Sequence, residues 1–359
     1  MKPVSYLEVS RDALRRNGER VAEFVGVPVI GVVKCGGYGV SVEEAARAWQ
    51  AAGAVMFAVS LPREALALRQ AGFTEDILLL SPVAEADTLN ELLEMGVILT
   101  VTGFESARFY SLHGETCPIR VHVAIDTGLG RFGIHWQDRA QLDAVYSMPG
   151  FLFKGIFSHF SSAFEPKYRQ TKLQLERFTA VTSYLAEKGC PVGLRHIANS
   201  AAALRFPETR LDAVRIGSAL VGRAGALSPL KLEEAAVFRA QVLDRRTLRR
   251  GDTTGYAAVC RVRRSVTVAA VAIGTENGFG RIKPPEGLPL RNFLGWLLGL
   301  LRRYLDPPAV YYGGRRLRLV GRIGNQVTLF DAGGLDLRPG DYVEARADLL
   351  TPGQERVFV

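Results

Sequence analysis

Short apolar runs alternate with helical patterns along the first two thirds of the chain. The runs are rich in β-branched and aliphatic residues, as buried strands are, and they cover residues 29–33, 55–59, 77–80, 97–101, 119–124, 153–157, 193–196 and 213–216. Several of the helical segments between them end at glycine, a common residue after a helix C-terminus. Eight strand–helix units in about 215 residues predict a (β/α)8 barrel. A doubly wound sheet is the alternative, because the pattern does not report whether the sheet closes.

The pattern changes after about residue 229. From there apolar and polar residues alternate, and Gly and Asp turns separate the runs, which predicts an all-β domain. We therefore expect an α/β chain with three parts. An N-terminal strand within 1–11 joins the β domain, a TIM-type barrel covers 12–228, and the β domain covers 229–359.

One segment, at about 288–308, interrupts the β pattern. Its sequence, LRNFLGWLLGLLRRYLDPP, is apolar nearly all round a helix, with Arg291, Arg302 and Arg303 near its ends. The segment is too short to span a bilayer. A helix that is buried or lies in a subunit interface fits this pattern. A helix over 290–305 that lies on a membrane surface is the alternative that the pattern does not favour.

Composition and charge narrow the class of protein. The 359 residues are 48% hydrophobic and 23% charged, as in a globular protein with a sizeable core. The formal net charge is +9, but the chain has no zinc-finger spacing or aromatic RNA-binding motif, so nucleic-acid binding is not favoured. The four cysteines form no CxxC, and the N-terminus has no apolar core of signal-peptide length. We expect a cytoplasmic protein without a disulfide framework or a metal site.

Lys34 ends the apolar run in VPVIGVVKCGGYG, and a glycine-rich turn with an embedded tyrosine follows it. A lysine at the carboxyl end of a buried strand leaves water for a partly apolar site, which lowers its pKa and makes the amine a better nucleophile. Such a lysine can hold an aldehyde cofactor. A solvated lysine at a strand end is the ordinary alternative. The choice between the two interpretations depends on the residues at the ends of the other predicted strands.

Polar and charged residues also follow or end other predicted strands. In a barrel, the carboxyl ends of all strands meet at one mouth. The set contains an amine, imidazoles, arginines, and small residues whose backbone N–H groups suit a phosphate: Lys34, Tyr38, Asp126, Arg131, His159, His196, Asn199, Ser200, Arg215, Gly217 and Ser218. These groups suit pyridoxal 5'-phosphate. Each alone has an ordinary structural alternative, such as a core histidine or an ion pair at the barrel rim.

The motifs around these residues resemble those of the alanine racemase family. VVKCGGYG resembles the cofactor-lysine motif VVKANAYG, and IDTGLGRFG resembles DTGMGRLG. RHIANSAAAL and AVRIGSALVG resemble HxANSAA and VRPGIALYG, and GDTTGYAAV resembles GxxVGYGAT. The matches occur in the family's order over nearly the whole chain. The resemblance implies a fold of barrel plus β domain and a racemase that depends on pyridoxal 5'-phosphate.

The resemblance also implies two opposed bases. Lys34 would form a Schiff base with the cofactor and then act on one face of the substrate Cα. Tyr256, from the β domain of the partner subunit in a homodimer, would act on the other face. His159 would lie against the cofactor ring, and Arg215 would donate to the ring nitrogen, with His196 behind it as the orienting residue.

The remaining implied contacts concern the phosphate and the substrate. Ser200, Gly217 and Ser218 would bind the phosphate with help from Tyr38, and Asn199 would lie beside the ring. Arg131 and Asn325 would lie at the carboxylate of a small amino-acid substrate.

Departures from the family motifs gather around the substrate. Ala124 stands where the family has a lysine that braces the arginine, and Thr275 stands where an inner-gate tyrosine is expected. Asn325 and Gln326 replace a methionine and an aspartate, and Glu355 replaces a tyrosine near the phosphate. We expect interconversion of L- and D-alanine. The alternatives are a racemase of another or of several amino acids, or a cofactor-binding relative with weak racemase activity.

Overall fold

A computed structural model describes the chain apart from residues 1, 116–117, 256–257, 259, 282–289 and 347, and apart from the side chains of 290–292 and 302–304. It divides into two units, which we describe separately. One unit is Arg11–Ala235; the other combines Met1–Ser10 with Ala236–Val359. The division falls at residue 235, whereas the sequence pattern suggested 228.

The first unit is a closed ring of eight parallel strands. They are β2 (Val29–Val32), β3 (Met56–Val59), β4 (Asp76–Leu79), β5 (Leu99–Val101), β6 (Ile119–Asp126), β8 (Phe151–Phe157), β9 (Leu194–His196) and β10 (Val214–Ile216). The strands pair in the orders β10-β2-β3-β4 and β5-β6-β8-β9, and a bridge between Leu78 and Ile98 joins these two groups. Each strand coincides with one of the apolar runs of the sequence.

Backbone hydrogen bonds between β9 and β10 and the residues next to them close the ring. Asp212 N donates to Arg195 O at 3.2 Å, and Arg215 N donates to Ala198 O at 3.0 Å. This closure confirms the predicted barrel and excludes the doubly wound alternative.

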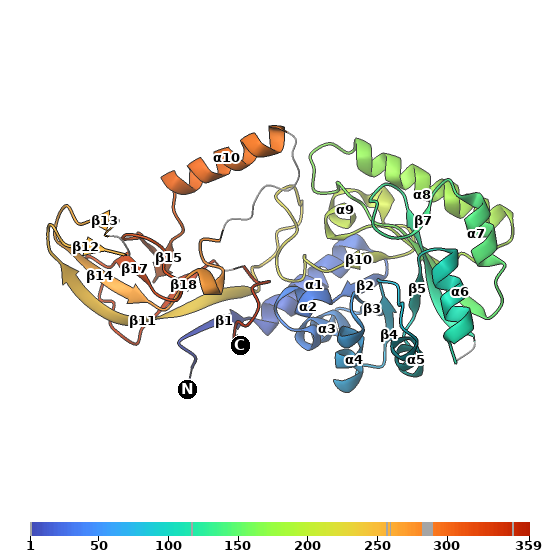
Figure 1. Cartoon of the computed structure of the whole chain (residues 1–359), viewed down its shortest axis with the longest axis horizontal. Helices are drawn as coiled ribbons and strands as arrows, with labels where there is room; N and C mark the ends of the chain where they lie inside the picture. The colour runs from blue at the N-terminus through green and yellow to red at the C-terminus, as the bar shows by residue number, and fades with distance from the viewer. Residues whose placement is uncertain (1, 116–117, 256–257, 259, 282–289, 347) are drawn as a thin grey trace. The chain divides into compact units, whose positions relative to one another are not determined.

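Helices separate the barrel strands along the chain and lie around them (Figure 1). They are α1 (Arg11–Val25), α3 (Val42–Ala51), α4 (Pro62–Gln70), α5 (Ala86–Glu94), α6 (Phe104–His113), α7 (Arg139–Tyr146), α8 (Arg169–Glu187) and α9 (Ser200–Arg205). Smaller elements are the turn α2 (Lys34–Tyr38), the strand β7 (Ile134–His135) beside β6, and the 3-10 helix η1 (Pro207–Thr209).

Strand β2 shows how the alternation of side chains builds the barrel. Ile30 and Val32 belong to a buried cluster with Met56, Ala58 and other strand residues. Gly31 is also buried but lies against the fully buried Trp49 of α3, where a Cβ would come within 2.7 Å of the indole. The strand that leads to Lys34 therefore packs directly on a helix because residue 31 has no side chain.

The second unit is built on a mixed sheet. Its strands are β1 (Ser5–Val9), β11 (Ala236–Leu248), β14 (Val266–Val271), β15 (Val310–Tyr312), β16 (Arg315–Leu317), β17 (Thr328–Asp331), β18 (Tyr342–Ala345) and β19 (Arg356–Phe358). The N-terminal strand β1 pairs with β11 antiparallel and with β19 parallel. The short pair β12 (Thr253–Thr254) and β13 (Cys260–Arg261) and the 3-10 helix η3 (Thr275–Asn277) complete the β part.

Helix α10 (Leu290–Leu305) forms within the segment that interrupts the β pattern. Several of its large apolar side chains are exposed. This exposure excludes the fully buried helix and leaves a contact with a second subunit or with a membrane surface. None of the helices in the described residues combines the length and apolar character that crossing a bilayer requires.

We predict that Gly31→Ala destabilises the barrel, because the added methyl group would overlap Trp49. Overpacking of this kind costs about 1–3 kcal/mol, which lowers Tm by several degrees in a unit of this size. Gly299→Ala is the matched control, since a Cβ there meets nothing within 4 Å and alanine favours a helix. Thermal unfolding followed by circular dichroism tests the pair. Equal Tm values for Gly31→Ala and wild type would contradict the packing argument.

Candidate active site

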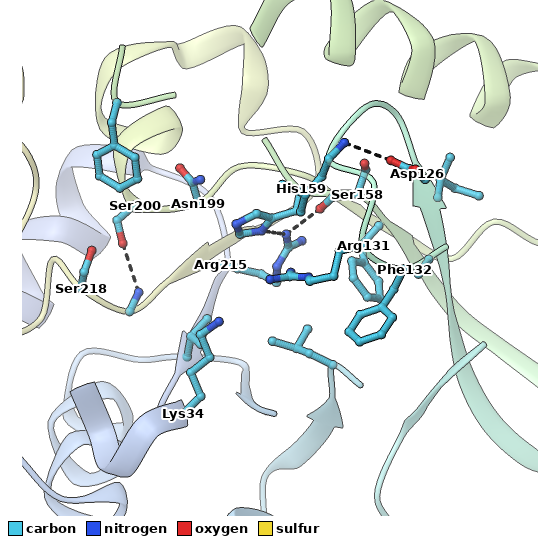
Figure 2. A pocket seen from close by; sticks show the side chains of 18 of the residues that line it. Lys34, Asp126, Arg131, Phe132, Ser158, His159, Asn199, Ser200, Arg215 and Ser218 are labelled. Carbon is cyan, nitrogen blue, oxygen red and sulfur yellow. Dashed lines mark hydrogen bonds between the residues drawn. The ribbon is translucent and has the colours of Figure 1, made fainter. Parts of the chain in front are cut away.

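A cavity of about 240 Å³ lies where the carboxyl ends of the barrel strands meet (Figure 2). Most of the residues expected from the sequence line it: Lys34, Tyr38, Arg131, His159, Asn199, Ser200, Arg215, Gly217 and Ser218. They come from the ends of β2, β8, β9 and β10 and from the loop after β6. Segments far apart in the sequence thus converge on one site.

Two expected residues lie elsewhere, and a third is outside the described residues. His196 is fully buried behind Arg215 and does not line the cavity. Asn325 belongs to the other unit, where its side-chain oxygen accepts a hydrogen bond from Thr275 Oγ1 at 3.3 Å. Tyr256 lies outside the described residues.

The turn after β2 is left-handed. Cys35, Gly36 and Gly37 have φ of 55°, 61° and 64°, and Tyr38 has φ of 56°. Each non-glycine residue in this conformation costs roughly 1–2 kcal/mol, so two glycines in the run reduce the strain. The turn reverses the chain immediately after Lys34 and brings both Lys34 and Tyr38 to the cavity.

Glu64 holds this turn in place. Its carboxylate is buried and accepts a hydrogen bond from Cys35 N at 2.7 Å, directly after Lys34. The other carboxylate oxygen accepts from Ser60 N at 2.9 Å and from Leu61 N at 3.1 Å at the start of α4. One side chain therefore ties the lysine turn to the end of the neighbouring strand β3.

Arg215 is the most connected group of the site. Its guanidinium is buried and donates to His196 Nδ1 at 2.6 Å, His196 O at 3.0 Å, Ser158 O at 2.6 Å and His159 Nδ1 at 3.1 Å. Burial and the nearby charge of Arg131 lower the pKa of Arg215 to about 9, so it stays protonated near neutral pH. The guanidinium also lies 5.1 Å from the centre of the Phe157 ring.

The arginine determines which histidine nitrogens carry protons. Because a guanidinium only donates, His196 Nδ1 and His159 Nδ1 must accept, and each ring then carries its proton on Nε2. His196 Nε2 lies 2.8 Å from His122 Nδ1. The hydrogen bonds from Arg215 to His196 and from His196 to His122 thus form a relay that continues into the barrel core. Burial, then the charge of Arg215, lowers the pKa of His159 and of His122 to about 3 and that of His196 well below its usual value. All three imidazoles are therefore neutral.

The cavity carries excess positive charge. Lys34, Arg131 and Arg215 border it, whereas the carboxylate of Asp126 accepts from the backbone N–H groups of residues 128–130 at 2.9–3.1 Å. Burial alone would raise the pKa of Asp126, but these donors hold it below the usual value. Burial, and secondly the charge of Arg131, lowers the pKa of Lys34. A neutral amine is therefore more accessible at Lys34 than on an exposed lysine.

The opposite side of the cavity is formed by small residues and a phenol. Gly217 N donates to Ser200 Oγ at 3.2 Å, and a Cβ at Gly217 would fall 2.2 Å from the Tyr38 ring. Burial raises the pKa of Tyr38 to about 12, so its hydroxyl keeps its proton. Asn199 Oδ1 accepts from Ala202 N at 3.1 Å, which leaves this side chain capping α9 at the cavity wall.

Sequence reasoning missed Glu64 and His122. Glu64 had a local signal, because a glutamate at the third position of a helix that begins with proline commonly binds backbone N–H groups. His122 had none, since its partner His196 is 74 residues away in sequence. Of the motif departures, Ala124 lines the cavity and is buried. Glu355 precedes β19, and its carbonyl accepts from Leu7 N at 2.8 Å.

Comparison with known proteins agrees with this geometry. A family model described as "Alanine racemase, N-terminal domain" matches residues 9–225. The alanine racemase of Desulforamulus reducens is 31% identical over 343 residues, covering 93% of this chain and 87% of that protein. The alanine racemase 2 of Bacillus subtilis is 30% identical over 307 residues, covering 79% and 76%.

Solved structures give the same result. The chain matches alanine racemase from Bacillus anthracis, determined with bound L-Ala-P, with a TM-score of 0.83 and 27% identity, covering 100% of this chain and 96% of that one. It matches the alanine racemase of Streptomyces lavendulae with a TM-score of 0.82 and 26% identity, covering 100% and 98%.

The barrel with a lysine and two arginines at its mouth, joined to a β unit, is the architecture of a racemase, a class of isomerases. The chain belongs to the alanine racemase family.

Replacing Glu64 with glutamine should loosen the turn that carries Lys34. The amide can still accept from Cys35 N, but its NH2 group would then face the N–H donors of residues 60 and 61. We expect a loss of about 1–3 kcal/mol and faster release of bound cofactor. Thermal unfolding and cofactor dissociation measure the two effects. Glu43→Gln, at an exposed pair with Arg47, is the control and should change neither.

The lowered pKa of Lys34 predicts the pH dependence of cofactor capture. The neutral amine is the reactive form, so uptake of pyridoxal 5'-phosphate by the cofactor-free chain should rise with pH through a midpoint below the usual lysine value of 10.5. Arg131→Gln removes a neighbouring positive charge and should move the midpoint to higher pH. Uptake is followed by the visible absorption of the bound cofactor. A midpoint that moves equally in Arg108→Gln, at an exposed ion pair on α6, would refute the assignment.

Proposed function

We propose that the chain is a pyridoxal 5'-phosphate-dependent racemase that interconverts L- and D-alanine, using Lys34 and Tyr256 as opposed bases. The observation that carries the proposal is the half-buried Lys34, with a lowered pKa, on the same cavity as Arg131, His159 and Arg215. Membership of the alanine racemase family supports the substrate.

The residues of the cavity fit the cofactor. Lys34 Nζ suits the aldehyde, and Ser200, Gly217 and Ser218, beside Tyr38, suit the phosphate, because the bare backbone at residue 217 leaves room that a Cβ would fill. Nη1 and Nη2 of Arg215 already donate to protein groups, and within the described residues its Nε–H has no acceptor. That N–H is therefore the donor available to a ring nitrogen, with His159 and Asn199 beside the ring.

Two groups of the chain move the proton. The bound cofactor supplies the electron sink that acidifies the substrate Cα–H. Lys34 Nζ accepts or returns this proton on one face, which requires the neutral amine that its lowered pKa favours. Tyr256, contributed by the partner subunit of a homodimer, does the same on the other face.

Arg215 and Arg131 have different tasks. A guanidinium with a pKa of about 9 remains a donor near neutral pH, so Arg215 holds a ring nitrogen in its unprotonated form and disfavours side reactions such as transamination. Arg131 borders the cavity and has no hydrogen bond or ion pair to any residue in the described part of the chain. It is therefore available to a substrate carboxylate, for which Asn325 is the further candidate.

The sequence departures leave the size of the substrate side chain less well defined than the cofactor chemistry. Ala124 and Thr275 are smaller than the residues that the family motifs carry at these positions, which favours room for a larger side chain. A racemase of another or of several amino acids is thus the second candidate, and a cofactor-binding relative with weak activity the third. In either case we place the enzyme in the cytoplasm.

We predict that Lys34→Ala abolishes both the visible absorption of bound cofactor and racemisation. Tyr256→Phe should keep the absorption but slow racemisation by about 10²–10⁴-fold, the usual contribution of a general acid or base. Lys172→Ala and Tyr311→Phe, both at exposed positions, are the controls. Chiral chromatography of a panel of D- and L-amino acids gives the rates and the substrate preference. Unchanged racemisation in both directions by Tyr256→Phe would refute the two-base assignment.

Mixing the two inactive variants tests the shared site. In a hybrid dimer one site has both bases and the other has neither, so random exchange of subunits should restore about a quarter of wild-type activity. If Tyr256 acts within its own subunit, mixing restores nothing.

A further inference from the structure

Helix α10 exposes a large apolar surface. Leu294, Leu297, Leu298, Leu301 and Leu305 are 48–73% exposed, and Phe293 is 48% exposed. Exposed apolar side chains are common singly, but six on one 16-residue helix form a contiguous patch. Such patches on a soluble chain mark a surface that another body covers.

The helix has three sides. At 100° per residue, the six exposed positions fall within a sector of about 140°. Trp296 and Leu300 are partly buried and lie next to one edge of this sector. Positions 291, 302 and 303, all arginine, fall on the remaining side together with Asn292, Gly295 and Gly299. The segment 290–305 contains no acidic residue.

This distribution is that of a helix lying in a membrane surface. Phe293 and the exposed leucines on one side, in a segment that carries arginines and no acidic residue, suit the boundary between lipid headgroups and acyl chains. The helix is about 24 Å long, shorter than the hydrocarbon core of roughly 30 Å, so it can lie in the surface but not cross.

We propose that α10 binds the chain reversibly to the surface of an anionic lipid bilayer, with the Phe293–Leu305 apolar side in the lipid and the positive charge of the segment attracting the headgroups. The net charge of +9 on the whole chain acts in the same direction.

Charge complementarity favours lipid over a second copy of the helix. A symmetric contact between two α10 helices would bring position 291 of one near 302 and 303 of the other, or like positions together, without an acidic residue between 290 and 305 to compensate. Anionic headgroups supply the missing negative charge.

The test is flotation of the full-length, cofactor-loaded protein with lipid vesicles. We expect binding to mixed phosphatidylglycerol and phosphatidylcholine vesicles, weaker binding at high salt, and little binding to phosphatidylcholine alone. Leu297→Glu/Leu301→Glu should reduce binding by about tenfold or more, and Arg302→Gln/Arg303→Gln by roughly 30-fold. Leu112→Glu, at a 65% exposed leucine on α6, is the matched control and should bind like wild type.

Three results would overturn the proposal. The first is the absence of wild-type binding to anionic vesicles, and the second is equal binding to neutral vesicles. The third is a change of oligomeric state of Leu297→Glu/Leu301→Glu in light scattering without lipid, which would assign the patch to a contact between chains. Cofactor absorption of each variant shows that it is folded. The arginine pair keeps the test informative if the leucine variant does not fold.

Discussion

The site depends on one buried cation. Arg215 sits at the last strand of the barrel, where its backbone N–H helps close the ring and its guanidinium enters the core. A buried charge is costly unless it is fully hydrogen-bonded, and here backbone carbonyls and two imidazoles accept from it. The closure of the barrel and the stability of this cation therefore require the same local geometry. Because the same backbone closes the barrel and accepts hydrogen bonds from Arg215, even short strands hold the guanidinium in one position.

The buried cation also determines the electrostatics around it. Since Arg215 only donates, the histidines it contacts are forced into one tautomer and remain uncharged. Asp126 is the one carboxylate in the described cavity lining, and its single negative charge offsets only part of the charge of Arg215, Arg131 and Lys34. Burial, and secondly this positive field, lowers the pKa of Lys34 and so favours its reactive amine, and the field also attracts anions. A cofactor phosphate and a substrate carboxylate bring the charge that this cavity lacks.

Strand positions and the cavity lining could be predicted because both follow from local rules. Apolar runs such as 29–33 mark buried strands, and residues at the ends of parallel strands must meet. The relay from Arg215 through His196 to His122 could not be predicted, because it pairs side chains on three strands that sequence spacing does not relate. The motif CGG also does not predict that the four residues after Lys34 all have positive φ, since glycine permits that conformation without requiring it.

The insertion that carries α10 shows why a β unit can accept a helix. Phe279 and Val310, on either side of the insertion, both belong to the buried core of this unit. The chain therefore leaves the core and returns to it, so the added segment replaces a connection and not a core element. Lengthening a loop costs little entropy, about 0.6 kcal/mol for each doubling. The unit can thus carry an exposed apolar helix between two core residues without repacking that core.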